Sequence, residues 1–210
     1  MLKAGLNIIL VVHFSKGLAF LEHTILARPD FRVISALKPT AATPTMDILF
    51  TAYYSSPIGW VEITADQTGI ASVLFVEKPA RAASEQPPPF LQDCLAQLEE
   101  YFKGKRQAFD VPVIVKGTEF QVQVWDELKT VSYAKLTTYK ALARKLKNPA
   151  AVRAIGNANS RNRLCLIIPC HRVVGSDNNL VGYAGGLWRK EWLIEHEATH
   201  GSGHQQLKLF

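Results

Sequence analysis

Residues 137–159, TTYKALARKLKNPAAVRAIGNAN, contain the patterns of two short helices joined by a tight turn. Apolar side chains recur at the spacing of one helical face over 139–146, and Thr137 or Thr138 is placed to cap that helix. The Asn148-Pro149 pair ends it, and a proline suits the first turn of a second helix over 150–159. This arrangement predicts a helix-turn-helix.

The charge around these helices is one-sided. Residues 129–163 include nine Lys and Arg and no Asp or Glu, in a chain of net charge +6. Such a cluster is typical of a surface that binds a polyanion, most simply a nucleic-acid backbone; a solvated basic face is the alternative. The second helix is rich in small residues and has Arg153 as its one long basic side chain, so it can approach a partner closely.

Composition and cysteine usage limit the class of protein. With 210 residues, 48% hydrophobic and 20% charged, the chain is neither disordered nor collagen-like, and it allows one domain or two small ones. Its three cysteines, Cys94, Cys165 and Cys170, form no Cys-x-x-Cys pair. This favours free thiols in a reducing compartment over a disulfide framework or a cysteine-rich zinc site. We expect a cytoplasmic protein, or a nuclear one if the source is eukaryotic.

The chain before the helix-turn-helix has the pattern of a small α/β unit. Residues 48–54, 60–65 and 70–76 predict a three-stranded meander, and 90–102 predict a helix with Cys94 on its buried face. A further short strand is predicted over 109–115, and a helix over 120–128 begins the second half. We therefore expect an N-terminal subdomain over 46–115, a C-terminal domain over 116–198 and a tail over 199–210.

The first 45 residues differ from the rest. Their apolar run over 5–12 is too short to span a membrane, and no clear cleavage site of a secretory signal follows it. Residues 40–45 have the composition of a linker. We expect 1–45 to be an extension that is poorly ordered or lies upstream of the true start.

A possible nucleophile follows the helix-turn-helix. The apolar run 164–168 predicts a buried strand that ends at Pro169-Cys170-His171-Arg172. A thiol beside an imidazole can act as a nucleophile, but neighbours on a strand face opposite sides, so a water relay or a bend at Pro169 is needed. A structural Cys-His pair is the alternative. Glu197, on a predicted last helix, is a candidate to orient His171, and the glycine-rich loop 182–186 suits a planar ligand.

These motifs resemble a known family. Residues 169–174, PCHRVV, are similar to the active-site signature of the O6-alkylguanine-DNA alkyltransferases, and the likeness extends over 117–121, Val124-Trp125, 153–156, Asn162 and 182–187. The resemblance covers nearly all of 46–198. It implies an α+β fold in which a small β-meander plus helix, ribonuclease H-like, precedes a helical, winged-helix-like alkyltransferase domain with the helix-turn-helix.

The resemblance also implies a function, namely direct-reversal DNA repair. A methyl or alkyl group would pass from O6 of a flipped-out guanine, or from O4 of a thymine, to Cys170 in a single turnover. The partner would be double-stranded DNA containing O6-alkylguanine, bound through its minor groove by a monomer. No cofactor, metal or membrane is implied.

Carried onto this chain, the family's roles fall on a defined set of residues. Cys170 would accept the alkyl group, His171 would take its proton through a water, and Glu197 would support the imidazole. Asn162 would tie the helix-turn-helix to the active-site turn, and Tyr139 would press on a phosphate and protonate guanine N3. The resemblance implies substrate or DNA contacts for Arg153, which would fill the gap left by the flipped nucleotide, for Tyr183 and the Ala184 N–H at the base, and for Ala151, Ala154, Gly156, Arg161 and Val173.

Some positions depart from the family pattern. Residues 131–134, VSYA, stand where Ile/Val-Pro-Tyr-Gly is usual, Arg163 stands where proline is common, and Ala184 stands where some members have serine. We interpret Cys165, which borders the pocket, as packing. These departures bear on the range of substrates more than on the reaction.

Two other functions and one other site are considered. A module that binds alkylated bases without repairing them would lack the acceptor thiol, which is present here as Cys170. A cysteine hydrolase would use Cys170, His171 and Glu197 with multiple turnover. His196, His200 and His204 have the spacing of one helical face, but no carboxylate or cysteine series supports a metal site, so none is assigned.

Overall fold

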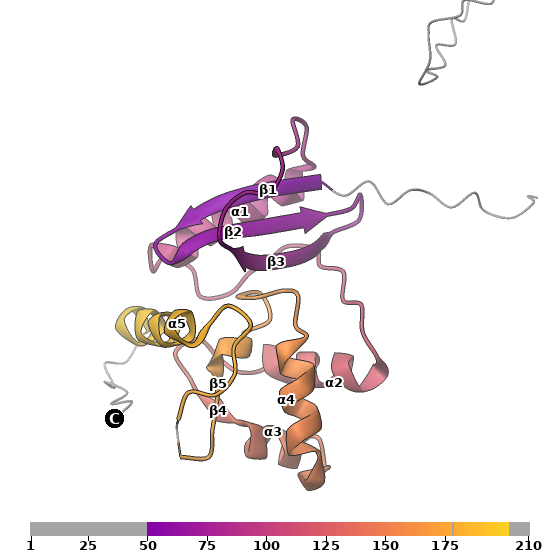
Figure 1. Cartoon of the computed structure of the whole chain (residues 1–210), viewed down its shortest axis with the longest axis vertical. Helices are drawn as coiled ribbons and strands as arrows, with labels where there is room; N and C mark the ends of the chain where they lie inside the picture. Colours follow the sequence, from indigo (N-terminus) through magenta and orange to yellow (C-terminus); the bar gives the residue numbers. More distant parts are fainter. Residues whose placement is uncertain (1–49, 178, 202–210) are drawn as a thin grey trace, which may run out of the picture. The chain divides into compact units, whose positions relative to one another are not determined.

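Three antiparallel strands form the sheet of the computed structural model, which describes residues 50–177 and 179–201. The strands β1 (Phe50–Ser56), β2 (Gly59–Ala65) and β3 (Ile70–Val76) pair in the order β1-β2-β3 (Figure 1). The tight β1–β2 turn requires Gly59, whose φ is +107°. The predicted meander is confirmed, with the first strand extended to Ser56; residues 48 and 49 lie outside the described part.

Helix α1 (Pro89–Phe102) packs against the sheet along β1. Its proline lies in the first turn, where a missing N–H costs nothing, and Leu91, Cys94 and Leu98 on one face are fully buried. The predicted helix is therefore confirmed. Burial raises the pKa of the Cys94 thiol to about 12, so Cys94 is an unreactive packing residue, as expected.

Two predicted strands are wrong. Segments 109–115 and 164–168 each make one isolated bridge to β3, from Val113 to Ile70 and from Leu164 to Val73. In the second segment Leu166 has a φ of +72°, and the Ile168 N–H donates to the Leu164 carbonyl at 2.8 Å, which closes the chain into a turn. An apolar run alone does not distinguish a strand from a buried turn.

The bridges have a structural consequence, because β3 is an edge strand of the sheet. The Val73 N–H donates to the Arg163 carbonyl at 2.8 Å, and the Cys165 N–H donates to the Val73 carbonyl at 3.0 Å. These bonds cover an edge that would otherwise be open to pairing. They also attach the segment that leads to Cys170 directly to the sheet.

The second half is mainly helical. It contains α2 (Glu119–Lys129), α3 (Tyr139–Lys145), the 3-10 turn η1 (Pro149–Ala151) and α4 (Val152–Ser160). Thr138 caps α3 by accepting a hydrogen bond from the Ala141 N–H at 3.0 Å, and α3 packs against α4. The predicted pair of helices is confirmed, although the second begins with a 3-10 turn.

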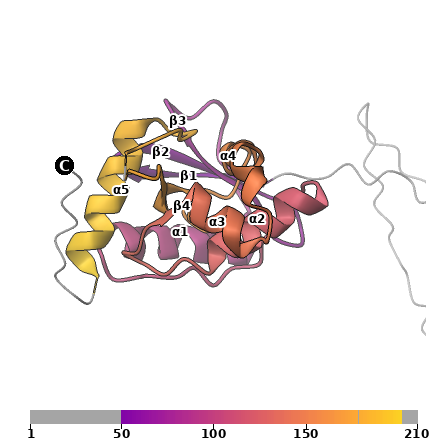
Figure 2. The same ribbon diagram turned by 90° about the horizontal axis from the view of Figure 1, so that it is seen from below.

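The remaining elements surround the Cys170 segment. The two-residue strands β4 (Thr137–Thr138) and β5 (Val173–Val174) pair in parallel. Of the two, β5 directly follows the 3-10 turn η2 (Cys170–Arg172). The last helix is α5 (Leu187–His200). In the views of Figures 1 and 2, β4 lies between α5 and the group α2, α3 and α4. Because β4 pairs with β5, which follows η2, the Cys170 segment adjoins this central position.

The expected α+β architecture, a meander with a helix followed by a helical half with a helix-turn-helix, is confirmed. Residues 1–45, expected to be an extension, lie outside the described residues, as does most of the expected tail. Among the described helices, none is long and apolar enough to cross a membrane.

Candidate active site around Cys170

Cys170 lies at the start of η2, directly after Pro169. The thiol residue is 3% exposed and His171 is fully buried. The chain bends at Pro169, where φ and ψ are −79° and 63°, and the Cys170 N–H donates to the Ile168 carbonyl at 2.8 Å. Cys170 and His171 are thus on a turn, and the strand geometry that would send them to opposite faces does not apply.

Asn162 fixes the segment that precedes the thiol. It is buried just after α4, and its Nδ2 donates to the Ile168 carbonyl at 2.8 Å. Its Oδ1 accepts from the Leu164 N–H at 2.9 Å. One amide side chain therefore connects the end of α4 with both sides of the turn before Cys170.

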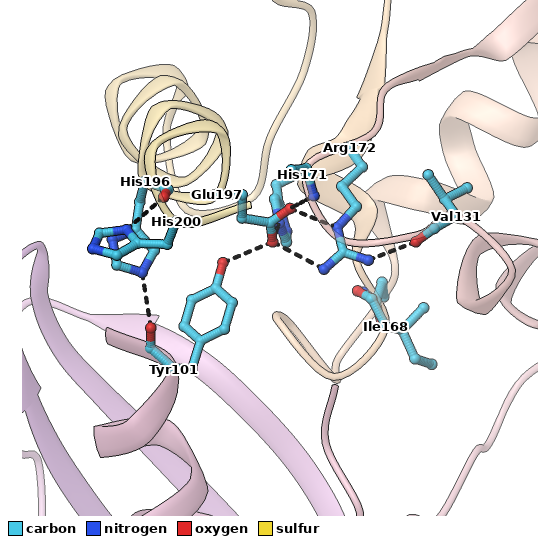
Figure 3. Close-up of polar contacts among 10 residues, drawn as sticks. Tyr101, Val131, Ile168, His171, Arg172, His196, Glu197 and His200 are labelled. Atoms are coloured by element: carbon cyan, nitrogen blue, oxygen red, sulfur yellow. Dashed lines mark hydrogen bonds and ion pairs between the residues drawn. The ribbon is translucent and has the colours of Figure 1, made fainter. Parts of the chain in front are cut away.

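Glu197 is the centre of a buried polar network (Figure 3). Its Oε1 is 2.8 Å from His171 Nε2, and Arg172 donates to both carboxylate oxygens from Nε and Nη2, each at 2.9 Å. The Tyr101 hydroxyl and the Ala134 N–H also donate to it, at 2.9 and 3.0 Å. A single carboxylate on α5 thus contacts α1, the segment before β4, and η2.

The network sets the protonation of His171. Burial alone would raise the pKa of Glu197, but the contacts with His171 and Arg172 hold it well below its usual value, so the carboxylate is ionised. Burial lowers the pKa of His171, so the ring is neutral at physiological pH. Because a carboxylate only accepts, Nε2 carries the hydrogen and Nδ1 carries the lone pair. This buried Nδ1 has no hydrogen-bond partner among the described residues, so it is free to accept a proton.

The surroundings of Cys170 favour its thiolate. A hydrogen bond from the Cys165 thiol lowers the pKa of Cys170 against the opposing effect of burial, and Asn162 and the charge of Lys190 lower it further. The pKa of Cys165 is correspondingly raised well above its usual value, so Cys165 remains a protonated donor. Cys165 is buried, which agrees with the interpretation as packing, and its thiol also acts on the pKa of Cys170.

Lys190 is a site residue that the sequence analysis missed. Its side chain is fully buried in α5, and Nζ donates to the Val181 carbonyl at 2.7 Å. Burial lowers its pKa to about 8, while the negative charge of Cys170 opposes that shift. A signal existed in the sequence, because a lysine shares one helical face with three buried residues of α5, Leu193, Ile194 and Glu197.

A pocket of about 460 Å³ lies between α4, the start of α3 and the segment 181–184. This volume is typical of a small-molecule site. Five predicted residues line it, namely Tyr139, Arg153, Gly156, Tyr183 and Ala184, together with Val152, Asn159, Ser160, Val181 and Gly182.

Four other predicted contact residues do not line the pocket. Ala154 and Arg161 are exposed on α4 and at its end, whereas Ala151 is buried in η1. Val173 is fully buried in β5, where its backbone pairs with Thr137. Cys170 does not line the pocket either. Its carbonyl, however, is 3.5 Å from Nδ2 of Asn159, and Asn159 does line the pocket.

The nine basic residues between 129 and 163 are all exposed. Lys129 and Lys145 pair with acidic residues of α2, Asp126 and Glu127, at 2.8 and 2.7 Å. The other seven make no ion pair within residues 50–177 and 179–201. The basic stretch therefore forms a positive surface beside the pocket, and most of its charges have no acidic partner in the described part of the chain. Arg153 belongs both to this surface and to the pocket lining.

The histidine series is engaged in other contacts. His196 Nε2 bonds the Tyr101 carbonyl, and His200 Nδ1 bonds the His196 carbonyl, both at 2.8 Å (Figure 3). His204 lies outside the described residues. Within the described part, no group of His, Cys, Asp and Glu is arranged to hold a metal ion.

Comparison with known families covers most of the chain. Residues 119–199 match the sequence model described as "6-O-methylguanine DNA methyltransferase, DNA binding domain". Residues 49–115 match "6-O-methylguanine DNA methyltransferase, ribonuclease-like domain".

Individual relatives agree with the family models. A methylated-DNA–protein-cysteine methyltransferase of Methanosarcina acetivorans is 39% identical, over 72% of this chain and 99% of its own length. One from Haemophilus influenzae is 37% identical, over 72% and 88%. Among solved structures, Mycobacterium tuberculosis OGT in complex with DNA matches with a TM-score of 0.64 and 33% identity, over 71% of this chain and 93% of that one.

Proposed function

The chain belongs to the 6-O-methylguanine DNA methyltransferase family, and on that premise we propose that it repairs DNA by moving an alkyl group from guanine O6 to Cys170. One observation carries the proposal. A buried thiol with a lowered pKa directly precedes a buried, neutral histidine whose Nδ1 has no partner among the described residues, and the carbonyl of the same cysteine meets Asn159 in the wall of a pocket. This is the arrangement that an activated nucleophile requires.

The reaction begins with removal of the thiol proton. We assign that proton to His171 Nδ1, reached through one water, while Glu197 holds the opposite ring nitrogen. The carboxylate stabilises the imidazolium that forms. The positive charge of Lys190 and the Cys165 thiol stabilise the thiolate.

The sulfur then attacks the alkyl carbon in line with the bond to O6. A carbon–sulfur bond forms as the carbon–oxygen bond breaks, and the electron pair of that bond remains on the guanine. Tyr139, at the edge of the pocket, supplies a proton to N3 of the leaving base. The product is a thioether on Cys170, which thiol exchange cannot reverse, so each molecule acts once.

The DNA must present its base outside the duplex, because a thiol cannot reach O6 carbon within stacked bases. We assign to Arg153 the filling of the space that the flipped nucleotide leaves, and its exposure on α4 and its position in the pocket lining support this role. The small exposed side chains of α4 suit close approach in the minor groove. The exposed basic residues around this helix supply the attraction to the backbone.

The division of roles follows the two family matches. We propose that residues 46–115 support the site and that 116–198 bind DNA and carry out the transfer. All the groups of the site come from one chain, so a monomer suffices. The intact thiol beside His171 distinguishes the chain from a module that only binds alkylated bases.

The test is direct. The protein is incubated with a duplex containing O6-methylguanine, and its peptides are mapped by mass spectrometry. We expect one methyl group per protein, on Cys170, with restoration of the guanine. A parallel duplex with O4-methylthymine tests the second substrate.

Cys170→Ala is the matched variant. It should bind the duplex and leave the lesion intact. Loss of the lesion while Cys170 stays unmodified, or continuing turnover beyond one equivalent, would overturn the proposal and favour hydrolysis.

A further inference from the structure

Asn159 is a buried polar residue of the pocket that has no assigned role. It lies on α4, lines the pocket and is 5% exposed. Its Nδ2 is 3.3 Å from the Tyr139 hydroxyl and 3.5 Å from the Cys170 carbonyl. The side chain therefore contacts both the proposed acid and the residue that carries the acceptor thiol.

The hydrogen-bond network fixes the orientation of this amide. A carbonyl oxygen only accepts, so the amide nitrogen, not the oxygen, faces Cys170. Oδ1 is buried and has no hydrogen-bond partner in the described part of the chain. An unpaired buried acceptor lowers stability, so packing alone does not account for an amide at this position.

The same bond determines what the Tyr139 hydroxyl can do. Because its oxygen accepts from Asn159, its own hydrogen points elsewhere, and it donates to the Val181 carbonyl at a long 3.5 Å. That carbonyl already accepts a shorter bond from Lys190. The Tyr139 hydrogen is thus weakly held at the pocket and is available to a ligand.

The electrostatics of Tyr139 show why the hydrogen bond from Asn159 matters. Burial and the nearby charge of Cys170 raise the pKa of Tyr139, whereas the bond from Asn159 opposes this rise. A hydroxyl that loses its proton here gains a negative charge in a buried place. A fixed N–H donor on its oxygen stabilises that charge.

We propose that Asn159 is a positioning residue for the reaction: it donates to Tyr139 and thereby directs the tyrosine hydrogen to the leaving guanine and stabilises the resulting phenolate. The inference rests on the proposed function. As the carbon–oxygen bond breaks, the tyrosine proton moves to the guanine ring nitrogen, and the phenolate later takes a proton from solvent. The side chain of Asn159 bonds the Tyr139 hydroxyl, so in this proposal it acts on the reaction through Tyr139.

The test is a double-mutant cycle on the full chain. Asn159→Ala and the isosteric Asn159→Asp are made in the parent and in Tyr139→Phe, and single-turnover methyl transfer is measured at saturating O6-methylguanine duplex. Reaction of Cys170 with iodoacetamide, followed by peptide mass spectrometry, reports thiol reactivity independently of Tyr139. Gln92→Ala, at an exposed amide of α1 and away from α4, is the matched control.

We expect Asn159→Ala to slow methyl transfer about tenfold in the parent and less than about twofold in Tyr139→Phe. Asn159→Asp, normalised to its iodoacetamide rate, should be at least as slow, because its carboxylate captures the tyrosine hydrogen. The iodoacetamide rate of Asn159→Ala and the methyl transfer of Gln92→Ala should match the parent.

Two results would overturn the inference while the proposed function stands. One is an equal loss in both backgrounds, which indicates a structural role. The other is an equal loss with iodoacetamide, which indicates a change at the thiol. A parent that transfers no methyl group to Cys170 rejects the proposed function itself, and the inference with it. If the alanine variant does not fold, the isosteric aspartate variant alone decides between these outcomes.

Discussion

Replacing Lys190 by methionine tests whether a charged ammonium is buried beside Cys170. Methionine has a similar length and cannot carry the charge. Burial lowers the pKa of Lys190 from 10.5 to about 8, so folding opposes the protonated form by about 3 kcal/mol at neutral pH. The hydrogen bond from Nζ to the Val181 carbonyl stabilises the folded protein by about 1.5–3 kcal/mol and so offsets part of this cost. We therefore expect the variant to be at least as stable as the parent at pH 7.

The pH dependence is the more specific part of this prediction. Above pH 8 the folded parent loses the proton that the unfolded chain retains up to about pH 10.5, so its free energy of unfolding rises with pH through this group. Lys190→Met lacks that rise. The free energy of unfolding of the variant minus that of the parent should fall by about 2–3 kcal/mol between pH 7 and pH 10.

Urea unfolding followed by tryptophan fluorescence at pH 7, 8, 9 and 10 measures this difference. Lys140→Met, at an exposed lysine of α3, is the control and should show no such trend. Iodoacetamide should react with Cys170 at a more alkaline pH in Lys190→Met, because the cation that favours the thiolate is gone. A difference between variant and parent that stays constant with pH would refute the burial of a charged lysine.

Three further substitutions test other parts of the structure. Glu197→Gln should destabilise the fold by about 3 kcal/mol or more in urea, because it leaves Arg172 without its charged partner; since the carboxyl pKa is held low, the parent loses this advantage progressively as the pH falls from about 4.5 toward the much lower pKa of the folded carboxyl, and the two stabilities approach each other over that range. Arg153→Ala should slow repair of duplex by about tenfold yet change transfer from free O6-alkylguanine base by less than about twofold, and equal losses would contradict the gap-filling role. Ala134→Gly should raise the unfolding free energy by about 0.5–1 kcal/mol, because Ala134 has a φ of +58° and relief of that strain exceeds the added entropy of the unfolded chain; an unchanged or lower melting temperature would argue against strain.

Helices and short antiparallel strands were the predictable parts of this fold. The 3.6-residue periodicity of α1, α2 and α3 and the turn residues of the meander are local signals, and the structure confirms these elements. Segments 109–115 and 164–168 failed because each makes only a single bridge to β3, while the apolar side chains of 109–115 are partly buried and those of 164–168 are almost all buried. That burial depends on tertiary contacts, which an apolar run does not encode.

The candidate site was predictable where a motif was present. The residues around Cys170 and the partner Glu197 follow from the family resemblance. Lys190 and Asn159 lie outside the motifs that carry that resemblance. Lys190 carried a local signal, a lysine on an apolar helical face. Asn159 carried none, because its importance depends on where the Tyr139 hydroxyl lies in space.

The departure at Ala134 now has a structural meaning. The left-handed backbone there suits the glycine that is usual in the family, and the Ala134 N–H donates to Glu197. The strain therefore lies at Ala134, whose N–H helps to hold the Glu197 carboxylate that bonds His171. It does not lie at a residue that lines the pocket.

The convergence of five hydrogen bonds on Glu197 limits how this protein can be redesigned. The carboxylate that orients His171 also joins three chain segments, so a variant selected for altered proton transfer at this position would first lose its fold. Directed evolution toward bulkier adducts should instead diversify Val181 and Ala184, while Gly182 is kept because its φ of +44° suits glycine. These residues form an exposed wall of the pocket, and the contacts that stabilise the interior do not depend on their side chains.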